Sequence, residues 1–406
     1  MHVVVTNMAN DGNRGDLAIL SGTISALRAA EPGIGISIAP AEVGSRERLD
    51  GAAMADSTAL ADGPLIASPV PGRVDEGGPA LLWTYRTARA LASQALGLRW
   101  IEGAVDADFR EAIGDADLVI AKGGSYLFSY PGLKQALFAA RMVHSLQVAR
   151  SVDTPSVVLG TSLGPVQRPL RRYFQSTLGS CRAVITRENL SFAFAREHLH
   201  LSNVQHGVDM AFALYPGAQS ERPRAGIAIT PRELPFEPPE ARLRYESAVV
   251  DAVELLLAET DQRCYFAVQV DRDRDLCERL ARRVGNAERV EVAHVDSLSL
   301  PELIDWYGRR ELLIATRLHS VILAALMHTP SVILECDPPK MIGISEQLGL
   351  ADWRLRAGLD EVRGLPRLAL SCFHGRDLKR DSFATRMQEL ATASREQASR
   401  ALDFVR

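Results

Sequence analysis

The chain has 406 residues, of which 47% are hydrophobic and 24% are charged, and its formal net charge is -4. This length exceeds one ordinary domain of about 150 residues, so we expect two or three domains. The composition excludes a disordered chain, and the slightly negative net charge argues against nucleic-acid binding over the whole surface.

Cysteine usage and hydropathy indicate the compartment. The five cysteines are widely spaced and form no CxxC pair, which argues against a disulfide framework and a structural zinc site. The N-terminal residues His2–Thr6 are typical of a first strand and not of a signal peptide. No window reaches the ~18–20 continuous apolar residues of a membrane span. We therefore expect a cytoplasmic protein without a transmembrane segment.

Short apolar runs alternate with amphipathic segments along the first half of the chain. A strand at His2–Thr6 leads through a polar loop into a helix at Leu17–Ala30, and residues 44–80 predict a loop-rich insertion. The next elements are predicted in chain order as strand Ala116–Ala121, turn Lys122–Ser125, helix Leu133–Ser151, strand Ser156–Gly160, strand Ala183–Thr186 and helix Glu188–His198.

The second half repeats this order. Its strands are predicted at Gly226–Thr230, Cys264–Val270, Arg289–Ala293, Leu312–Ala315 and Ser331–Leu334, the last of these being the final strand. Its helices are predicted at Leu243–Glu259, Leu276–Val284, Pro301–Tyr307 and His319–Met327. This alternation means parallel sheets with right-handed crossovers, so the predicted fold class is α/β with two Rossmann-like domains.

The domain boundary is expected between residues 205 and 222, where a polar Pro/Arg stretch begins. We predict an N-terminal Rossmann-like domain over residues 1–205 and a C-terminal one over residues 222–381. Residues 382–406 are rich in helix formers, and we expect them to form a helix that packs back on the first domain.

A junction between a strand and a helix carries the sharpest local feature. The apolar run Leu312–Ala315 leads directly into a helix, and Arg317 and His319 fall where the two meet. Backbone N–H groups at a helix start attract an anion, and the planar arginine fork suits a carboxylate or a phosphate. Histidine exchanges protons near neutral pH. Spacing alone also allows Arg317 to be a local cap and His319 an ordinary first-turn residue.

Two more cationic residues follow strands of the second half. Arg232 stands just past the first of these strands, and Lys340 follows the last by several residues. Because the ends of parallel strands lie at one edge of a sheet, we expect Arg232, Arg317 and Lys340 to converge on one anion. A solvated lysine is the alternative for Lys340.

Glycine-bearing loops follow strands of the first half. Asn13, Gly15 and Asp16 precede the first helix, where they form either a backbone nest or a plain turn with Asp16 as the N-cap. Gly123, Gly124 and Ser125 follow a later strand. The chain has no GxGxxG fingerprint and no P-loop, and its histidines show no metal-ligand spacing.

Together these segments resemble the polysaccharide pyruvyl transferase family. The order and spacing carry the resemblance, which ends in an R-L-H-S helix start, a lysine and a Gln-Leu-Gly. The matching segments are Asn13–Asp16, Gly123–Gly124, Gly160–Pro165, Arg187–Ser191, Asp209, Arg317–Ser320, Lys340 and Gln347–Gly349.

The resemblance implies a GT-B-like fold with the active site in the cleft between the two domains. It implies phosphoenolpyruvate as the donor co-substrate, a sugar diol as the acceptor, and a pyruvate ketal and phosphate as the products, with no cofactor and no metal. It assigns catalysis to Arg317 and His319. It also implies that the donor is bound in the C-terminal domain, by Arg232, Arg317, Leu318 and Lys340. The acceptor side is the N-terminal domain, with the loops that carry Asn13, Gly15, Asp16, Gly123, Gly124 and Ser125.

The sequence departs from the family pattern on the acceptor side. Gly123, Gly124 and Ser125 stand where the family usually has three glycines, and the apolar character of Tyr126–Ser129 is also unusual for it. The resemblance therefore defines the donor better than the acceptor. A lipid-linked acceptor would bring the chain to a membrane surface as a peripheral protein.

Two other functions fit the same fold. A glycosyltransferase with a nucleotide-sugar donor would need an acidic residue or a glutamine to bind the ribose, and Glu335 is the candidate in the second half. A non-catalytic binding protein would bind the donor without releasing phosphate.

Overall fold

The computed structural model describes residues 1–8, 13–40, 60–63, 65–69, 85, 87–92, 104–217, 223–286, 288–336 and 338–405. Contacts divide the chain into two units. Unit 1 is Met1–Ala213 together with Thr392–Arg406, and unit 2 is Leu214–Ala391. The predicted insertion at residues 44–80 lies outside the described residues, except for 60–63 and 65–69.

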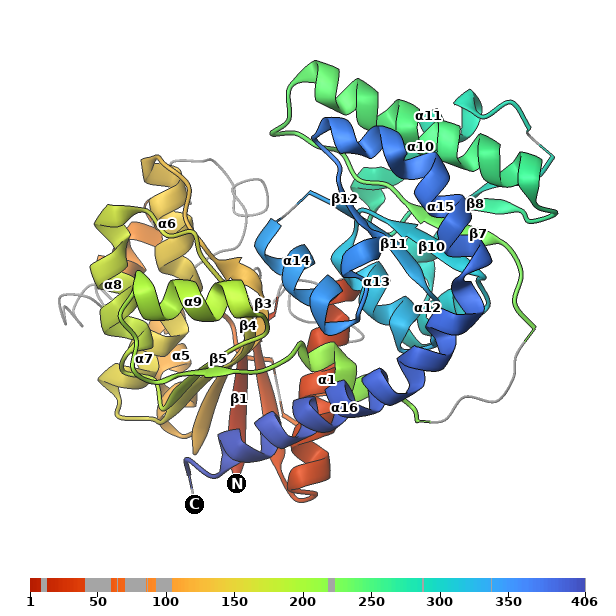
Figure 1. Cartoon of the computed structure of the whole chain (residues 1–406). Coiled ribbons are helices and arrows are strands. Elements are labelled where there is room, and N and C mark those ends of the chain that lie inside the picture. Colours follow the sequence, from red (N-terminus) through yellow and green to blue (C-terminus); the bar gives the residue numbers. More distant parts are fainter. Residues whose placement is uncertain are drawn as a thin grey trace. The chain divides into compact units, whose positions relative to one another are not determined.

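Unit 1 is built on a six-stranded sheet with the order β2-β1-β3-β4-β5-β6, in which all neighbouring strands run parallel (Figure 1). Its strands are β1 His2–Met8, β2 Gly35–Pro40, β3 Leu118–Leu127, β4 Ser156–Leu163, β5 Ala183–Thr186 and β6 Val204–His206. Its helices are α1 Arg14–Ala30, α5 Ala104–Gly114, α6 Leu133–Met142, α7 His144–Ser151, α8 Arg168–Leu178, α9 Asn189–Glu197 and the short η3 Met210–Leu214.

Unit 2 contains a second six-stranded parallel sheet, with the order β12-β11-β10-β7-β8-β9. Its strands are β7 Ile227–Thr230, β8 Cys264–Ala267, β9 Val290–Ala293, β10 Leu312–Ala315, β11 Ser331–Glu335 and β12 Arg354–Arg356. Its helices are α10 Pro239–Glu259, α11 Arg274–Arg283, α12 Leu300–Gly308, α13 Leu318–Ala325, α14 Pro338–Gln347, α15 Leu365–His374 and α16 Arg376–Leu402, with short helices η4 Asp271–Asp273, η5 Val295–Ser297, η6 Ala351–Trp353 and η7 Asp360–Gly364. The predicted α/β class with two parallel-sheet units is confirmed.

The unit boundary passes through α16, whose residues from Thr392 onward belong to unit 1. There the Gln397 side chain bridges the backbone that follows β6: Oε1 accepts from Val208 N at 3.0 Å and Nε2 donates to Val208 O at 2.9 Å. Gln397 and Val208 are both buried, so the end of α16 is part of the core of unit 1.

The predicted turn at Lys122–Ser125 is wrong, because these residues lie inside β3. Glycine indicates a turn in a sequence, but Gly123 serves a close approach of two strands. A Cβ atom at Gly123 would lie 2.2 Å from the carbonyl oxygen of Gly160 on β4. Gly124 has φ +148°, a conformation that side chains disfavour. The two glycines therefore let β3 and β4 remain in contact beyond the point where the pattern predicted a loop.

Other elements differ from the sequence pattern. The predicted helix Leu133–Ser151 is two helices, α6 and α7, with a break at Val143. Ser331–Leu334 is not the final strand, since the three-residue β12 pairs with β11 at the sheet edge. Strands β2 and β6 were not predicted at all.

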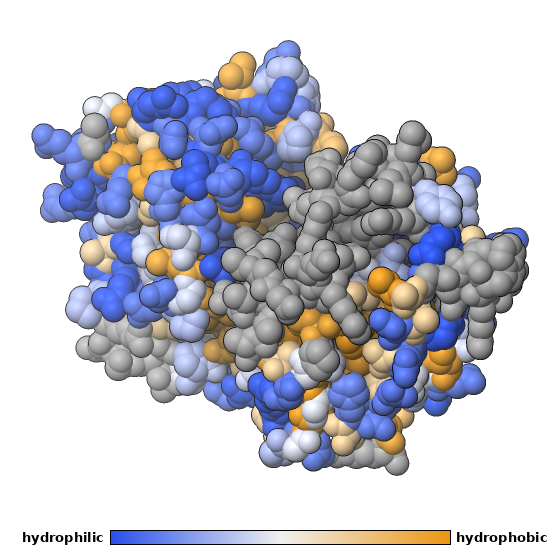
Figure 2. Space-filling view, turned by 180° about the vertical axis from the view of Figure 1, so that it is seen from behind, coloured by the Kyte–Doolittle hydropathy of each residue, from blue (hydrophilic) through white to orange (hydrophobic). Residues whose placement is uncertain are grey.

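The central strands β3, β4 and β10 are buried on both faces, as expected of parallel sheets covered by helices, whereas the edge strands β6, β9 and β12 are partly exposed. On the face shown in Figure 2, most of the coloured surface is hydrophilic, and apolar residues occur in separate patches. Among the described residues, no helix combines the length and the hydropathy that crossing a membrane requires.

Candidate active site

The start of α13 in unit 2 places the two residues that the sequence singled out. β10 ends at Ala315, Arg317 is the residue before the first turn of α13, and His319 is the second residue of that helix. Ser320 fixes the junction, because its Oγ donates to Arg317 O at 2.6 Å and lies 2.8 Å from Thr230 Oγ1 on the adjacent strand β7. Arg317 and His319 are both half-buried at this strand end.

Arg317 forms a side-on ion pair with Asp273, the last residue of η4 after β8. Arg317 Nε lies 2.8 Å from Asp273 Oδ2, and Nη2 donates to Oδ1. The Arg317 side chain is 11% exposed and that of Asp273 only 1%. A guanidinium has five N–H donors, and this pair engages two of its nitrogens. The sequence did not predict this partner, since 44 positions separate the two residues.

Arg232 reaches the same strand end from β7. Its Nη1 lies 3.6 Å from Cys336 Sγ, and its backbone N donates to Tyr245 OH at 3.2 Å. Tyr245 OH in turn lies 2.8 Å from Thr316 Oγ1, next to Arg317 in the chain. Burial raises the pKa of Tyr245, so this hydroxyl stays neutral and serves as a hydrogen-bonding link. The network joins Arg232 to the residue that precedes Arg317.

Lys340 lies in the first turn of α14 and is half-buried. Its neighbour Met341 accepts from Cys336 N at 3.5 Å, which ties the start of α14 to the end of β11 near Arg232. Leu318, the first residue of α13, is buried. The structure therefore places Arg232, Arg317 and the chain around Lys340 at the ends of three adjacent strands, β7, β10 and β11.

Glu335, the candidate for binding a ribose, ends β11. Its carboxylate lies 3.5 Å from Arg354 Nε and 3.8 Å from Arg356 Nε, both on β12. Burial raises the pKa of Glu335, while the two arginines lower it. This carboxylate is thus engaged by two arginines of its own sheet.

In unit 1, Asp16 forms the centre of a polar cluster at the start of α1. Lys122 Nζ lies 2.8 Å from Asp16 Oδ1, and Asn13 Nδ2 donates to Oδ2 at 2.7 Å. Lys122 is 1% exposed and Asp16 is 20% exposed. The alternative of Asp16 as the N-cap is wrong, because α1 begins at Arg14 after Asn13. Gly15 is buried within the first turn.

Ser125 on β3 contacts a buried arginine. Ser125 Oγ accepts from Arg187 Nη2 at 2.6 Å, Ser162 Oγ from Nε at 2.9 Å, and Asp209 Oδ2 from Nη1 at 2.5 Å. Arg187 is 1% exposed and Asp209 fully buried. Gly124 lies near the Asp16 cluster, since a Cβ at Gly124 would be 3.7 Å from Asp16 Oδ1. Lys122 and Arg187 as ion-pair partners were not predicted, because both pairs join distant parts of the chain.

Two α/β units of this kind define the GT-B-like class, and solved structures match most or all of the chain. A glycosyltransferase from Rickettsia africae ESF-5 gives a TM-score of 0.57 at 12% identity, covering 100% of this chain and 97% of that one. A UDP-N-acetylglucosamine 2-epimerase gives 0.56 at 13% identity over 99% and 94%. The UDP-GlcNAc 2-epimerase from Methanocaldococcus jannaschii gives 0.53 at 10% identity over 91% and 92%. At these identities the likeness concerns the fold alone.

The sequence itself identifies the family. The family model of the polysaccharide pyruvyl transferases matches residues 13–338, more than half of the chain. The chain therefore belongs to the polysaccharide pyruvyl transferase family, and the resemblance drawn from its motifs is confirmed.

Proposed function

We propose that this protein transfers the pyruvyl group of phosphoenolpyruvate to two hydroxyl groups of a saccharide, which forms a pyruvate ketal and releases phosphate. The observation that carries this proposal is the pair of arginines, Arg232 and Arg317, at adjacent strand ends beside His319. Membership of the pyruvyl transferase family supports the same reaction class.

The donor carries a carboxylate and a phosphate, so its site must supply positive charge. Arg232 and Arg317 provide two guanidinium groups at neighbouring strands, and Lys340 follows the next strand. The backbone N–H of Leu318 belongs to the first turn of α13, where unsatisfied donors favour an anion. Bidentate contacts between arginine and an oxyanion are among the strong charge-assisted hydrogen bonds.

Asp273 acts as a positioning residue in this proposal. Its two carboxylate oxygens hold one edge of the Arg317 guanidinium, which fixes the plane of that group. An arginine held in one orientation binds a ligand without losing further side-chain entropy. The near-complete burial of Asp273 means that its charge depends on Arg317 for compensation.

His319 is the proposed general acid and base. A proton is delivered to the methylene carbon C3 of the donor, so that C2 becomes electrophilic. One saccharide hydroxyl attacks C2 and loses its proton, and the bond between C2 and the phosphate oxygen breaks. The second hydroxyl then attacks C2 and closes the ketal. Of the two protons that the hydroxyls give up, one replaces the proton used at C3 and the other leaves with phosphate. The scheme requires no additional cofactor, because the two substrates and His319 supply every group that it uses.

The acceptor is assigned to unit 1. Asn13, Gly15 and Asp16 lie at the start of α1, and Gly123, Gly124 and Ser125 lie on β3 next to them. Asp16 is oriented by Lys122 and Asn13, and carboxylates accept hydrogen bonds from sugar hydroxyls. We propose Asp16 as the principal acceptor contact among these residues.

A nucleotide-sugar glycosyltransferase is the second candidate, because the similar folds are those of a glycosyltransferase and nucleotide-sugar epimerases. The ion pairs of Glu335 with Arg354 and Arg356 count against its role in binding a ribose. A binding protein without turnover would hold phosphoenolpyruvate and release nothing.

The test is phosphate release from phosphoenolpyruvate in the presence of a panel of simple glycosides. We expect release that depends on a glycoside and falls strongly in Arg317→Lys and His319→Gln. The matched controls are Arg279→Gln and His294→Gln, which change a partly exposed arginine and an exposed histidine of unit 2. Glycoside-independent release, or equal loss in the controls, would contradict the proposal. Saturable donor binding without release would favour the binding protein.

A further inference from the structure

One segment of unit 1 carries a surplus of positive charge. Residues 118–187, which run from the start of β3 to the residue after β5, contain nine lysines and arginines and a single acidic residue, Asp153. The whole chain has a formal net charge of -4. Helices α6, α7, α8 and α9 pack on the same core cluster, so they cover one face of the unit 1 sheet (Figure 1). A local excess of one sign of charge favours a partner of the opposite sign.

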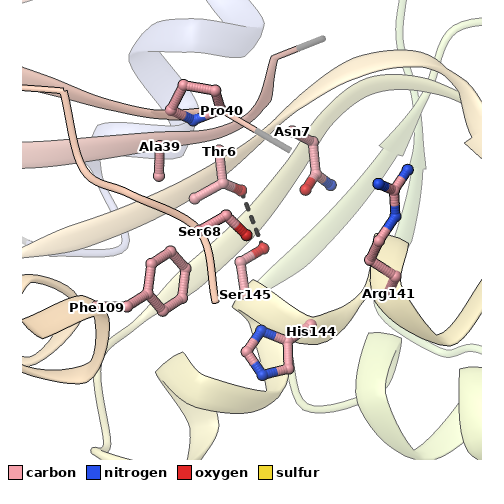
Figure 3. Close-up of a pocket in the computed structure, with 9 residues that line it drawn as sticks. All are labelled: Thr6, Asn7, Ala39, Pro40, Ser68, Phe109, Arg141, His144 and Ser145. Atoms are coloured by element: carbon pink, nitrogen blue, oxygen red, sulfur yellow. Dashed lines mark hydrogen bonds between the residues drawn. The ribbon is translucent and has the colours of Figure 1, made fainter. Parts of the chain in front are cut away.

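Three of the nine cations are buried inside unit 1. Lys122 and Arg187 form the ion pairs with Asp16 and Asp209 described above. Arg141 is 3% exposed and lines a small pocket beyond the end of β1 (Figure 3). The six remaining cations lie wholly or partly at the surface.

These six cations divide between the two edges of the sheet. Arg182 immediately precedes β5, and Arg150 donates to Ser176 Oγ near the end of α8, so both lie at the amino-terminal edge. The other four follow the carboxyl ends of β3 and β4, and the segments that contain them, residues 128–134 and 164–172, have no acidic residue. They are Lys134, Arg168 and Arg172, which are exposed, and Arg171, which is half-exposed.

Hydrogen bonds hold these two segments against each other. Ser129 N donates to Pro165 O at 2.9 Å, and Gln167 N donates to Ser129 Oγ at 2.7 Å. Farther along, Tyr173 OH of α8 donates to Ala140 O of α6 at 3.4 Å. The starts of α6 and α8 therefore contribute to one surface of unit 1. We call it the basic surface and define it by Tyr130, Leu133, Lys134, Arg168, Arg171 and Arg172.

The positive charge of the basic surface is not compensated by its surroundings. Within the described part of the chain, none of Lys134, Arg168 and Arg172 forms an ion pair. Lys134 and Arg168 lie in the first turns of α6 and α8, where the helix dipole disfavours cations, and neither first turn has an acidic residue. Arg168 and Arg172 are four positions apart on α8, where like charges repel each other. An anionic partner would relieve all of these unfavourable interactions.

Apolar side chains project from the same surface. Leu133, the first residue of α6, is 76% exposed, and Tyr130 is 44% exposed. The Tyr130 ring is supported from below by the half-buried Phe128, whose ring centroid lies 5.2 Å away. Exposed leucine is stabilised in the interfacial region of a bilayer, where tyrosine is also enriched. Apolar residues flanked by cations are the combination with which peripheral proteins bind anionic membranes.

We propose that the basic surface binds a membrane that contains anionic lipids. Leu133 and Tyr130 enter the headgroup region, while Lys134 and the arginines of α8 contact lipid phosphates. The basic surface and the Asp16 cluster lie at the same carboxyl-terminal edge of the unit 1 sheet. Binding would therefore bring the proposed acceptor contact to a lipid-linked saccharide. This role rests on the proposed function, whereas membrane binding itself does not.

The experiment is co-sedimentation of the full chain with vesicles in the absence of both substrates. The vesicles consist of phosphatidylcholine alone or of phosphatidylcholine mixed with phosphatidylglycerol, and alginate serves as a soluble acidic polysaccharide. The wild type is compared with Arg168→Gln/Arg172→Gln and with Leu133→Ser. The matched control is Arg150→Gln/Arg182→Gln, which removes the same charge at the opposite edge of the sheet. All five positions are exposed, so we expect folded variants, and thermal unfolding checks this.

We expect the wild type to bind the vesicles that contain phosphatidylglycerol and to dissociate as the salt concentration rises, since salt screens the attraction. The vesicle Kd should rise by about tenfold or more in Arg168→Gln/Arg172→Gln, because each cation near an anionic surface contributes about fivefold. It should rise several-fold in Leu133→Ser, which loses an apolar contact. In the control it should change by less than about twofold, because the attraction falls off within a Debye length.

Four results would overturn the inference. These are no binding to the phosphatidylglycerol vesicles, an equal loss of binding in the control, an unchanged Kd in both surface variants, and tighter binding of alginate than of vesicles. The last result would assign the basic surface to an acidic polysaccharide. Vesicle binding is measured without phosphoenolpyruvate, and phosphate release can be measured with soluble glycosides without vesicles. The membrane surface and the proposed transfer can therefore fail separately.

Discussion

Each unit places an arginine–aspartate pair after the carboxyl ends of its parallel strands, and the two pairs differ in how completely they are covered. In unit 1, Arg187 directly follows β5, and its Nε, Nη1 and Nη2 atoms contact Ser162, Asp209 and Ser125. In unit 2, Arg317 follows β10, and its Nε and Nη2 atoms both donate to Asp273.

The exposures show what the difference means. Arg187 is 1% exposed and Arg317 is 11% exposed. All three guanidinium nitrogens of Arg187 are bound within unit 1, so this side chain holds strand ends together. The guanidinium of Arg317 is held along one edge by Asp273, which leaves its other edge in an orientation that a ligand can reach. The comparison indicates a structural role for the Arg187 pair, and it is consistent with our proposal that the donor binds at Arg317.

The largest expected effect is on turnover in unit 2. His319→Gln should lower kcat by about 10²–10⁴-fold, because a positioned general acid or base contributes that much. The thermal unfolding midpoint should stay close to that of the wild type, since His319 is half-buried on α13 and glutamine retains a hydrogen-bonding group. Steady-state kinetics beside thermal unfolding checks this. A folded variant with the wild-type kcat would remove His319 from the mechanism.

The next effect is on stability in unit 1. Arg187→Met should lower the free energy of unfolding by about 3–5 kcal/mol, because it leaves the buried Asp209 carboxylate without its partner. Denaturant unfolding measures this loss, and Arg182→Met, which changes an exposed arginine just before β5, is the control. A loss below about 1 kcal/mol, the range of surface pairs, would mean that solvent reaches the Arg187 pair.

A thiol reagent can test whether the donor binds near Arg232, because Cys336 lies beside this arginine and the other four cysteines are buried. Burial raises the pKa of Cys181 to about 11 and the pKa values of Cys264, Cys277 and Cys372 to about 12, so these thiols stay protonated at pH 8. Cys336 is half-buried and lies 3.6 Å from Arg232 Nη1. We expect a thiol reagent to modify Cys336 first, and phosphoenolpyruvate to slow that reaction several-fold. Peptide mapping by mass spectrometry follows both. An unchanged rate at saturating donor would place the donor away from Arg232.

The smallest effect belongs to the surface of unit 2. Arg279, whose side chain is 41% exposed, forms ion pairs at 2.9 Å with Glu233, which is 47% exposed, and with Glu246, which is 12% exposed. Arg279→Gln should change the free energy of unfolding by less than about 1 kcal/mol and leave kcat/KM unaltered, since solvent screens the pair with Glu233 and Glu246 keeps its ion pair with Arg283 at 3.0 Å. A marked loss of activity in this variant would mean that the donor site extends to α11.

The sequence predicted those parts of the fold that depend on local patterns. β5 and β10 lie where the apolar runs placed them, and the helix start after Arg317 followed from the same junction. Gly123 was misassigned because its role depends on the approach of β4, a contact that a local pattern does not contain. β12 was not predicted because this edge strand has only three residues, and two of them are arginines.

For the site, the sequence supplied residue types but not their partners. The ends of parallel strands correctly indicated that Arg232 and Arg317 lie at one edge. Asp273 holds Arg317 from a separate βα connection, and Lys122 holds Asp16 across 106 positions. The Arg317–Asp273 pair depends on the order of the strands in its sheet, in which β7 lies between β10 and β8. No local sequence motif encodes this order.

The most direct test of the central claim is to follow the donor carbon itself. Phosphoenolpyruvate labelled with carbon-13 at C2 is incubated with the protein and a glycoside panel that includes acidic sugars, and the label is observed by NMR. We predict that the label appears as a ketal carbon bonded to two sugar oxygens, with one phosphate released for each ketal, and that neither forms with His319→Gln. Label found only in free pyruvate, or unchanged donor with every glycoside, would contradict pyruvyl transfer by this protein.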